Sequence, residues 1–222
     1  MNPHIKNLRR IILPILFLCL LLPCAVTQAQ QNKETGLPFI SNYEPFVYGA
    51  DPINWNIIQD DRGIIYVANT KGLLEYDGST WRLISLPDNA GARSFARDSN
   101  GRIFVGGNNQ IGYLSADSLG RTVFVSIKEQ LPEEHRELGE IWDIHFLQDN
   151  MFLNTHQKLI RLNNNVIKVW ESISGFHMSK VVHENLYIRE WGKGLSRLEG
   201  EKIELLPGGE LFANERIYQI LP

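Results

Sequence analysis

A repeat of roughly 40 residues is the feature that most constrains how this chain can fold. The clearest copy runs from Trp55 to Ile84, where short apolar stretches alternate with turns that contain glycine or aspartate. Laying Gly63 on Gly101 aligns the next copy, and apolar anchors then recur at steps of 38, 48 and 36 residues: Leu73, Ile111, Leu159 and Leu195. A period of this length with several short strands in each copy is typical of a β-propeller, whose blades are four-stranded antiparallel sheets.

The copies span residues 55–84, 92–127, 140–170 and 176–206, and residues 212–222 begin another. The stretch Ile64–Val67 is apolar at odd and even positions alike, so both faces of its strand should be buried between neighbouring sheets. We therefore predict an all-β fold: an incomplete β-propeller of about four four-stranded antiparallel blades, plus the first strand of a fifth over Arg216–Ile220. Propellers close with paired ends, so residues 48–222 are expected to be a partial propeller that is the N-terminal fragment of a longer protein.

The first 29 residues have the pattern of a signal peptide. Lys6, Arg9 and Arg10 precede the apolar run Ile11–Val26, and small residues lead to a cleavage site after Ala29. The alternative is a retained membrane anchor, although the run contains two prolines and is shorter than the ~20 residues that a span prefers. Residues 1–29 are predicted to be a signal peptide, and the rest of the chain to be exported.

Removal of this segment changes the composition of the mature chain. Both cysteines, Cys19 and Cys24, leave with it, so we expect no disulfide and no thiolate metal site. The whole chain has 22 basic and 25 acidic residues, and loss of three basic residues leaves 19 against 25, a net charge of −6. An acidic domain without a basic cluster is a poor partner for nucleic acid. The predicted partners therefore exclude nucleic acid, and no cofactor is predicted.

Residues 30–47 are predicted to be an extended lead-in, because prolines interrupt them and their aromatic residues can pack on the first blade. Within the repeats, one column of residues should tolerate a left-handed turn conformation. This column of structural turn residues is Gly63, Gly101, Asp149 and Asn185.

Three tryptophans are the candidate ligand-binding residues: Trp55, Trp142 and Trp191. Two of them head equivalent segments, since Trp55-Asn56-Ile57 aligns with Trp142-Asp143-Ile144. Indole rings can form a platform on which a sugar stacks, and the alternative is ordinary packing in the core.

The sequence lacks the nucleotide-binding, zinc-protease and serine-hydrolase motifs. His177 and His183 are either ordinary histidines or a zinc pair. Ser115–Thr122 approximates the Asp-box hairpin of sialidases and other propellers, which is a structural turn held by side-chain bonds to the backbone. A sialidase-like enzyme would need an arginine cluster, and the arginines available are Arg93, Arg102, Arg121, Arg161, Arg189 and Arg197.

The stretch from Asn54 to Trp81, NWNIIQDDRGIIYVANTKGLLEYDGSTW, and the following DSNGRIFVGGNNQIGYL resemble the amino-terminal propeller of bacterial two-component-regulator-type sensors. In the first copy the match includes Gly63, Ile65, Tyr66, Gly72 and Leu73, followed by Tyr76, Asp77 and Gly78. The second copy matches at Gly101, Ile103, Phe104, Val105, Gly106 and Ile111, and the later copies are more degenerate.

The resemblance implies a receptor of the hybrid two-component, triple-tyrosine-motif type. Such receptors place a ligand-binding propeller on the periplasmic face of the bacterial inner membrane, anchored by a downstream transmembrane helix. The implied partners are an environmental small molecule or oligosaccharide, the later blades and signalling domains of the same chain, and a second copy in a homodimer. The expected function is thus a non-catalytic sensor domain. The alternative is a secreted propeller enzyme that acts on glycans, either a sialidase-like hydrolase or a lyase.

Overall fold

The computed structural model describes residues 39–163 and 166–221. The predicted signal peptide, residues 1–29, and the start of the lead-in lie outside the described residues. The chain divides into two units, Met1–Ser41 and Asn42–Pro222, and the described strands all belong to the second. Across the described ranges, no helix combines the length and the apolar character that a membrane crossing requires.

The described strands of this unit form four antiparallel sheets, each made of four strands. The first holds β1 (Asn54–Gln59), β2 (Ile65–Asn69), β3 (Gly72–Tyr76) and β4 (Trp81–Ile84). The second holds β5 (Ala92–Arg97), β6 (Ile103–Gly107), β7 (Gln110–Ala116) and β8 (Thr122–Ser126). The third holds β9 (Ile141–Leu147), β10 (Asn150–Thr155), β11 (Lys158–Asn163) and β12 (Val166–Glu171). The fourth holds β13 (Phe176–Val182), β14 (Asn185–Glu190), β15 (Gly194–Glu199) and β16 (Lys202–Leu205).

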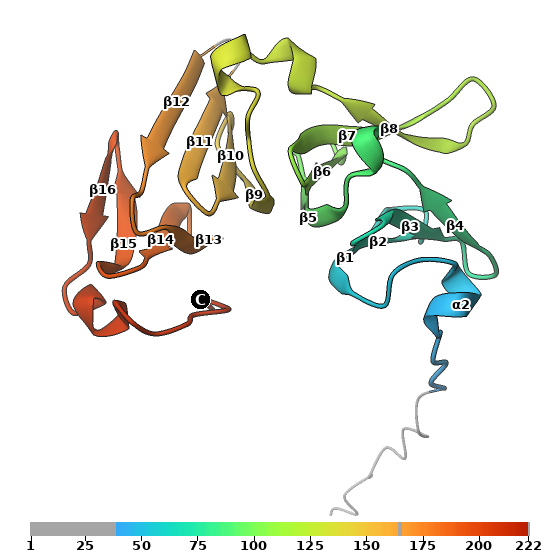
Figure 1. Ribbon diagram of the computed structural model, residues 1–222, viewed down its shortest axis with the longest axis horizontal. Coiled ribbons are helices and arrows are strands. Elements are labelled where there is room, and N and C mark those ends of the chain that lie inside the picture. Colours follow the sequence, from blue (N-terminus) through green and yellow to red (C-terminus); the bar gives the residue numbers. More distant parts are fainter. Residues whose placement is uncertain (1–38, 164–165, 222) are drawn as a thin grey trace, which may run out of the picture. The chain divides into compact units, whose positions relative to one another are not determined.

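The strands of each sheet follow one another in chain order, and the sheets are joined through their first strands. β1 contacts β5, β5 contacts β9, and β9 contacts β13, so consecutive sheets meet along one line of first strands (Figure 1). This is the arrangement of propeller blades, and it confirms the predicted fold of four-stranded antiparallel blades.

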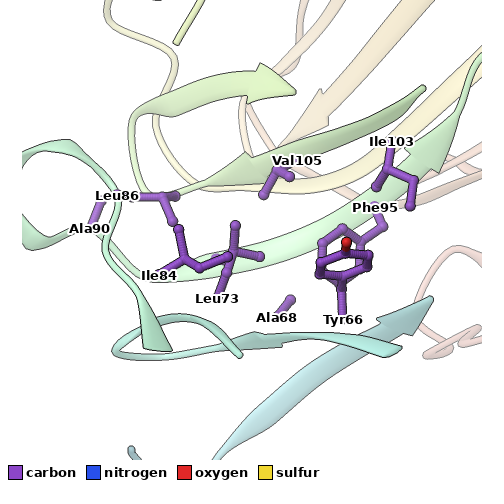
Figure 2. Packing of buried hydrophobic residues seen from close by; sticks show 10 residues of the cluster. Tyr66, Ala68, Leu73, Ile84, Leu86, Ala90, Phe95, Ile103 and Val105 are labelled. Atoms are coloured by element: carbon purple, nitrogen blue, oxygen red, sulfur yellow. The ribbon is translucent and has the colours of Figure 1, made fainter. Parts of the chain in front are cut away.

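The core lies between consecutive blades rather than within one of them. Between blades one and two, Tyr66, Ala68 and Leu73 pack against Phe95 and Val105, as Figure 2 shows. A second cluster joins blades two and three through Phe104, Ile111, Ile141, Ile144, Leu153 and Ile160. A third joins blades three and four through Phe152, Leu159, Phe176, Leu186 and Ile188. The second strands of the first two blades, β2 and β6, are therefore buried on both faces, as the apolar run Ile64–Val67 predicts.

An aspartate starts three of the hairpin loops, which have the same five-residue form, 60–64, 98–102 and 117–121. In the first, Asp60 Oδ1 accepts hydrogen bonds from the backbone amides of Arg62 (2.9 Å) and Ile64 (3.0 Å). Asp117 caps its loop in the same way, so the Asp-box-like stretch Ser115–Thr122 is a structural turn. The glycine at the fourth position has a positive φ, +86° at Gly63 and +81° at Gly101.

In the later two blades the turn prediction holds only in part: Asp149 lies in its turn, whereas Asn185 is the first residue of β14. Neither Asp149 nor Asn185 has a positive φ; the residues that do are Gln148, His183 and Glu184. In these blades Leu147 pairs with Asn150 and Val182 with Asn185, so the hairpin closes through only two residues. In a two-residue hairpin the left-handed residues are in the short loop itself. They therefore lie one or two residues before the positions that align with the glycines of the five-residue loops.

The lead-in is helical at its end, contrary to the extended conformation predicted for residues 30–47. Pro45–Tyr48 form the one-turn helix α2, with proline in the first turn and Gly49 in the left-handed conformation after it. Proline is favoured at a helix start and glycine just beyond its end, which explains the turn. Tyr43 and Tyr48 pack on Trp81, at 5.3 Å and 5.8 Å between ring centroids, whereas Phe46 is exposed.

The predicted opening strand of a fifth blade is not formed. Residues 214–221 have no regular secondary structure and follow the 3-10 turn η4 (Gly209–Phe212). A strand needs a hydrogen-bonded neighbour, and no described strand pairs with Arg216–Ile220.

The insertion between blades two and three contains two further 3-10 turns, η2 (Lys128–Gln130) and η3 (Glu133–His135), as its charged composition allows. The remaining turn, η1 (Pro87–Asn89), joins blades one and two.

Candidate functional site

The first strand of every blade contains a β-bulge near its start. In β1 the pairing with β2 passes from Asn54 to Asn56, which leaves Trp55 without a partner across the ladder. The pairings of the other first strands skip one residue at the equivalent place. The residues in the bulges are Trp55, Arg93, Trp142 and His177. A bulge redirects a side chain and is common beside functional sites.

A second column lies beside the bulges, at the residue that directly follows the second strand of each blade. This column is Thr70, Asn108, His156 and Trp191. Contacts join the two columns: Trp55 Nε1 donates to Thr70 Oγ1 at 3.0 Å, and the ring of His177 meets that of Trp191 edge-on at 5.3 Å between centroids. The repeat therefore presents two side chains per blade at the same end of the sheet.

A cavity of about 480 Å³ opens at this end of the blades. Its wall is mainly aromatic and apolar, and it includes all three of the tryptophans singled out from the sequence. The lining residues are Trp55, Trp142, Asp143, His156, Phe176, His177, Met178, Trp191, Ile217 and Tyr218. The structure thus brings together Trp55, Trp142 and Trp191, which come from blades one, three and four.

Two of these indoles form one aromatic unit. The rings of Trp55 and Trp142 lie edge to face, with 5.4 Å between centroids and an interplanar angle of 76°. The guanidinium carbon of Arg93 is 4.6 Å from the centroid of Trp55 and 5.7 Å from that of Trp142. Trp55 is 43% exposed, so its ring is a surface of the cavity rather than part of the core.

The third tryptophan is backed by a buried arginine. Arg189 has no exposed surface, and its guanidinium carbon is 3.5 Å from the ring centroid of Trp191. Arg189 donates to the carbonyl oxygens of Phe212 (3.2 Å) and Ala213 (2.9 Å). It therefore holds both the indole and the backbone just before the segment that carries Ile217 and Tyr218 to the cavity.

The polar part of the wall is formed by a carboxylate and two histidines. Asp143 Oδ2 accepts hydrogen bonds from Ser179 N and Asn154 Nδ2, both at 3.1 Å, so one of its oxygens is already engaged. Burial, together with the guanidinium groups of Arg189 and Arg216, lowers the pKa of His177. His177 is therefore neutral at pH 7, and its ring lies edge-on to Tyr218 at 5.6 Å.

His177 and His183 cannot form the zinc pair considered from the sequence. His177 lies near the start of β13, and His183 lies in the turn beyond the end of this strand. Six residues of extended strand separate them by about 20 Å, far more than two ligands of one ion can span.

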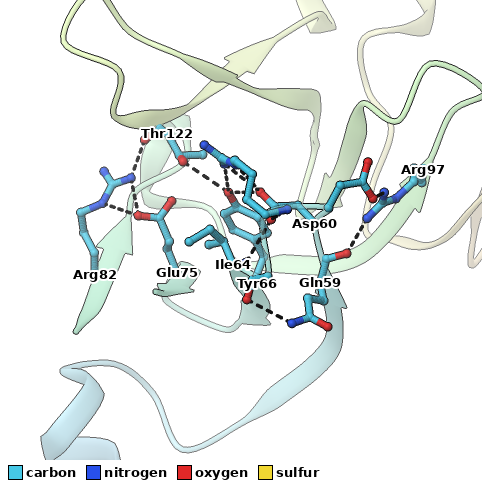
Figure 3. A network of polar contacts seen from close by, with 11 residues as sticks. Gln59, Asp60, Ile64, Tyr66, Glu75, Arg82, Arg97 and Thr122 are labelled. Carbon is cyan, nitrogen blue, oxygen red and sulfur yellow. Dashed lines mark hydrogen bonds and ion pairs between the residues drawn. The ribbon is translucent and has the colours of Figure 1, made fainter. Parts of the chain in front are cut away.

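A smaller cavity of about 250 Å³ lies between blades one and two, beside the aspartate loops. In its wall Asp60 binds Arg62, and Tyr66 Oη lies 3.3 Å from Thr122 Oγ1. Arg82, which does not line the cavity, extends this network of paired groups by donating from Nη2 to the Thr122 carbonyl at 2.8 Å (Figure 3). Burial opposes ionisation of Asp60, but Arg62 and two backbone amides outweigh it and hold the pKa of this carboxyl below its usual value. Because its charges are paired within the fold, we assign this network to structure.

Sequence reasoning missed Arg93, His177 and Tyr218 as parts of the site. A signal for the first two was present, since the alignment of Trp55-Asn56-Ile57 with Trp142-Asp143-Ile144 extends to Arg93-Ser94-Phe95 and His177-Met178-Ser179. No equivalent signal existed for Tyr218, which reaches the cavity on an irregular segment.

The fold and the site define a β-propeller domain with an aromatic cavity at the bulged ends of its first strands. No protein family profile matches the sequence, and no curated protein matches it. Among solved structures, the chain is similar to the extracellular domain of a B. thetaiotaomicron protein described as a hybrid two component system. The TM-score is 0.54 at 18% identity, and the match covers 73% of this chain and 22% of that one.

The chain is also similar to streptogramin B lyase, with a TM-score of 0.53 at 17% identity over 71% of this chain and 56% of the lyase. The chain is similar as well to a catalytically inactive virginiamycin B lyase from Staphylococcus aureus, solved with quinupristin. The TM-score is 0.52 at 17% identity, and the match covers 68% of this chain and 54% of that lyase. The chain thus spans about a fifth of the extracellular domain of the two component system protein and just over half of each lyase. At these identities the likeness is one of fold, and the hybrid two-component domain is of the type that the repeat motifs resemble.

Proposed function

We propose that this chain supplies a non-catalytic ligand-sensing propeller domain of an exported, membrane-anchored signalling receptor. The observation that carries the proposal is the convergence of Trp55, Trp142 and Trp191 on one cavity. The motif resemblance to two-component-regulator sensors and the similar fold of a hybrid two component extracellular domain support the same function. The signal-peptide pattern of residues 1–29 supports export to the periplasmic face.

The proposed ligand is a small molecule or an oligosaccharide with an apolar face. Indole rings offer a wide, rigid surface against which the C–H face of a pyranose can pack, at little cost in conformational entropy. The cavity, about 480 Å³, lies in the size range of small-molecule sites. Binding would press the ligand between strands of blades one, three and four, and so couple it to the relative packing of these blades.

The proposed partners of the whole receptor are its later blades and signalling domains, together with a second copy. The acidic balance of the chain, with 25 acidic and 22 basic residues, argues against nucleic acid as a partner of this segment.

Titration calorimetry of the full chain against a panel of neutral oligosaccharides tests the proposal. We expect saturable binding by at least one compound, and a loss of at least tenfold in affinity, or about 1.4 kcal/mol, for Trp55→Ala, Trp142→Ala and Trp191→Ala. Trp170→Ala is the control, because Trp170 lies on the fourth strand of its blade and donates to the Glu201 carbonyl. Equal effects at all four positions, or no binding by any compound, would contradict a saccharide site at the tryptophans.

A propeller lyase is the second candidate, favoured by the similar fold of streptogramin B lyase. Asp143, His156 and His177 in the cavity wall are the groups that could move a proton. A sialidase-like site is disfavoured, since of the six arginines considered only Arg93 and Arg189 stack on rings that line the cavity. The other four stand apart from it and pair with acidic residues, Asp98, Asp117, Glu201 and Glu199. Turnover of any panel compound, abolished by His177→Gln, would favour the enzyme over the sensor.

A further inference from the structure

Each indole of the cavity already has a cation against it. Arg93 stacks on Trp55 and lies near Trp142, with centroid distances of 4.6 Å and 5.7 Å, and Arg189 stacks on Trp191 at 3.5 Å. These distances fall within the roughly 6 Å at which a guanidinium is attracted to the ring quadrupole. Each of the three tryptophan rings is therefore already engaged in a cation–π interaction with an arginine of the protein itself.

Both arginines are fixed rather than free to swing away. Arg93 Nη2 pairs with Glu140 at 2.9 Å and Nη1 donates to the Ala92 carbonyl at 3.2 Å, and its side chain is 10% exposed. Arg189 is wholly buried and donates to two backbone carbonyls. One N–H group of each guanidinium, Nε of Arg93 and Nη1 of Arg189, has no hydrogen-bond partner among the described residues. The positive charge of Arg189 is thus not neutralised by a direct ion pair in the described chain.

A pocket with three tryptophans and a tyrosine would otherwise suit an ammonium group, since aromatic cages bind such cations. Here an ammonium placed on the open face of an indole would lie about 8 Å from the guanidinium behind it. At an effective dielectric constant of about 20, that repulsion lowers the affinity for a unit cation by roughly thirtyfold. An uncharged ligand of the same shape feels no such repulsion.

We propose that Arg93 and Arg189 determine the charge selectivity of the cavity: each places a positive charge behind an indole whose open face the ligand uses, so the site accepts neutral saccharides and excludes ligands that bear an ammonium group, such as amino sugars. This inference rests on the proposed ligand-binding function and names the class of ligand. It assigns Arg93 and Arg189 as specificity-determining residues.

Three acidic groups act in the opposite direction, and one of them, Glu215, attracts the charge of Arg189 without forming a direct ion pair with it among the described residues. Asp143 is in the wall, but its Oδ2 is bonded to Ser179 N and Asn154 Nδ2. Glu140 is 37% exposed and is paired with Arg93. Neither Asp143 nor Glu140 pairs with Arg189, which stacks directly on Trp191 and donates to backbone carbonyls.

The test compares choline with its uncharged carbon analogue, in which a tert-butyl group replaces trimethylammonium. Binding of each compound to the full chain is followed by tryptophan fluorescence. We expect Arg93→Met to bind choline at least tenfold more tightly than the unchanged protein does, with a much smaller change for the analogue. Arg93→Lys keeps the charge and should continue to exclude choline.

Arg102→Met is the matched control, because Arg102 stacks on Phe104 and Tyr113 at 5.1 Å and 4.9 Å, outside the cavity. Choline affinity should not change in this variant. If thermal melts show that Arg93→Met is unfolded, Arg93→Gln replaces it, since glutamine keeps hydrogen-bonding capacity without charge. Choline binding that does not increase in the neutral variant overturns the proposal, as does choline binding to the unchanged protein more tightly than the analogue.

Neither probe is a saccharide. A failure of the oligosaccharide panel would therefore contradict the proposed ligand class while leaving this comparison of charge intact.

Discussion

The indole rings of Trp55 and Trp142 meet edge to face at 5.4 Å, although they belong to the first strands of blades one and three. Arg93, on the first strand of the blade between them, lies over both rings. All three residues occupy the same bulge position of the repeat. The β-bulge that recurs in successive blades therefore forms one wall of the cavity.

Coupling between these two indoles should be visible by circular dichroism in the ultraviolet. Two indoles in contact at a fixed angle give an exciton couplet, which neither ring gives alone. We expect Trp55→Phe and Trp142→Phe to remove the same feature, each nearly completely. Trp170→Phe should leave it in place, because Trp170 pairs with Glu201 of the fourth blade instead. A couplet that survives either substitution in the pair would rule out this contact in solution.

The interface between blades two and three should carry much of the stability. Leu153 has no exposed surface and lies in the cluster with Ile141 and Ile160. Leu153→Ala should lower the free energy of unfolding by about 2–5 kcal/mol, since it removes buried methyl groups and leaves a cavity. Val166→Ala, at a position that is 61% exposed, should change it by no more than about 0.5 kcal/mol. Denaturant melts measure the free energy of unfolding of both variants. Equal losses in the two variants would show that this interface is not tightly packed.

Stability should fall as the pH is lowered through the titration of His145. Burial lowers the pKa of this histidine, against the nearby carboxylate of Asp143, and its Nε2 lies 3.0 Å from the Ser179 carbonyl on the next blade. Because the folded pKa is below the unfolded value of about 6.5, the unfolded chain takes up the proton first. The neutral histidine therefore stabilises the fold above pH 6.5 or so, and this contribution is lost as the pH falls from there to the folded pKa.

His145→Gln should flatten this part of the pH profile of the melting temperature, because glutamine can still donate to Ser179 and does not titrate. His183→Asn is the control: His183 is exposed in a turn with φ of +45°, which asparagine tolerates. An unchanged slope in His145→Gln would assign the pH dependence to another group.

Substitutions in two hairpin turns should change the stability of the protein in opposite directions. Gly101 has a φ of +81°, so Gly101→Ala should destabilise the protein by about 1–2 kcal/mol. Glu184 has a φ of +59° in its two-residue turn, so Glu184→Gly should be neutral or stabilising by up to about 1 kcal/mol. Thermal melts of both variants measure the pair. Destabilisation by Glu184→Gly comparable to that of Gly101→Ala would contradict the left-handed conformation at residue 184.

The four described blades and the strands within them could be predicted from the sequence because they depend on local, periodic signals. Ile64–Val67 is apolar throughout, and a turn residue such as Gly63 or Gly101 precedes each second strand of the first two blades. The later turns were predicted only in part, since loops of two and five residues have the same flanking strands but place the left-handed residue differently. The strand expected over Arg216–Ile220 failed for another reason: pairing is not a property of one segment.

Residue types by themselves determined that Trp55, Trp142 and Trp191 were worth considering, and the repeat determined that two of them are equivalent. Only the tertiary structure decided that the three meet at one cavity, with Arg93 and Arg189 against their rings. The physical reason is that a bulge displaces one side chain out of the ladder. Where that side chain ends up depends on the neighbouring blade packed beside it, which lies some 40 residues away in the chain.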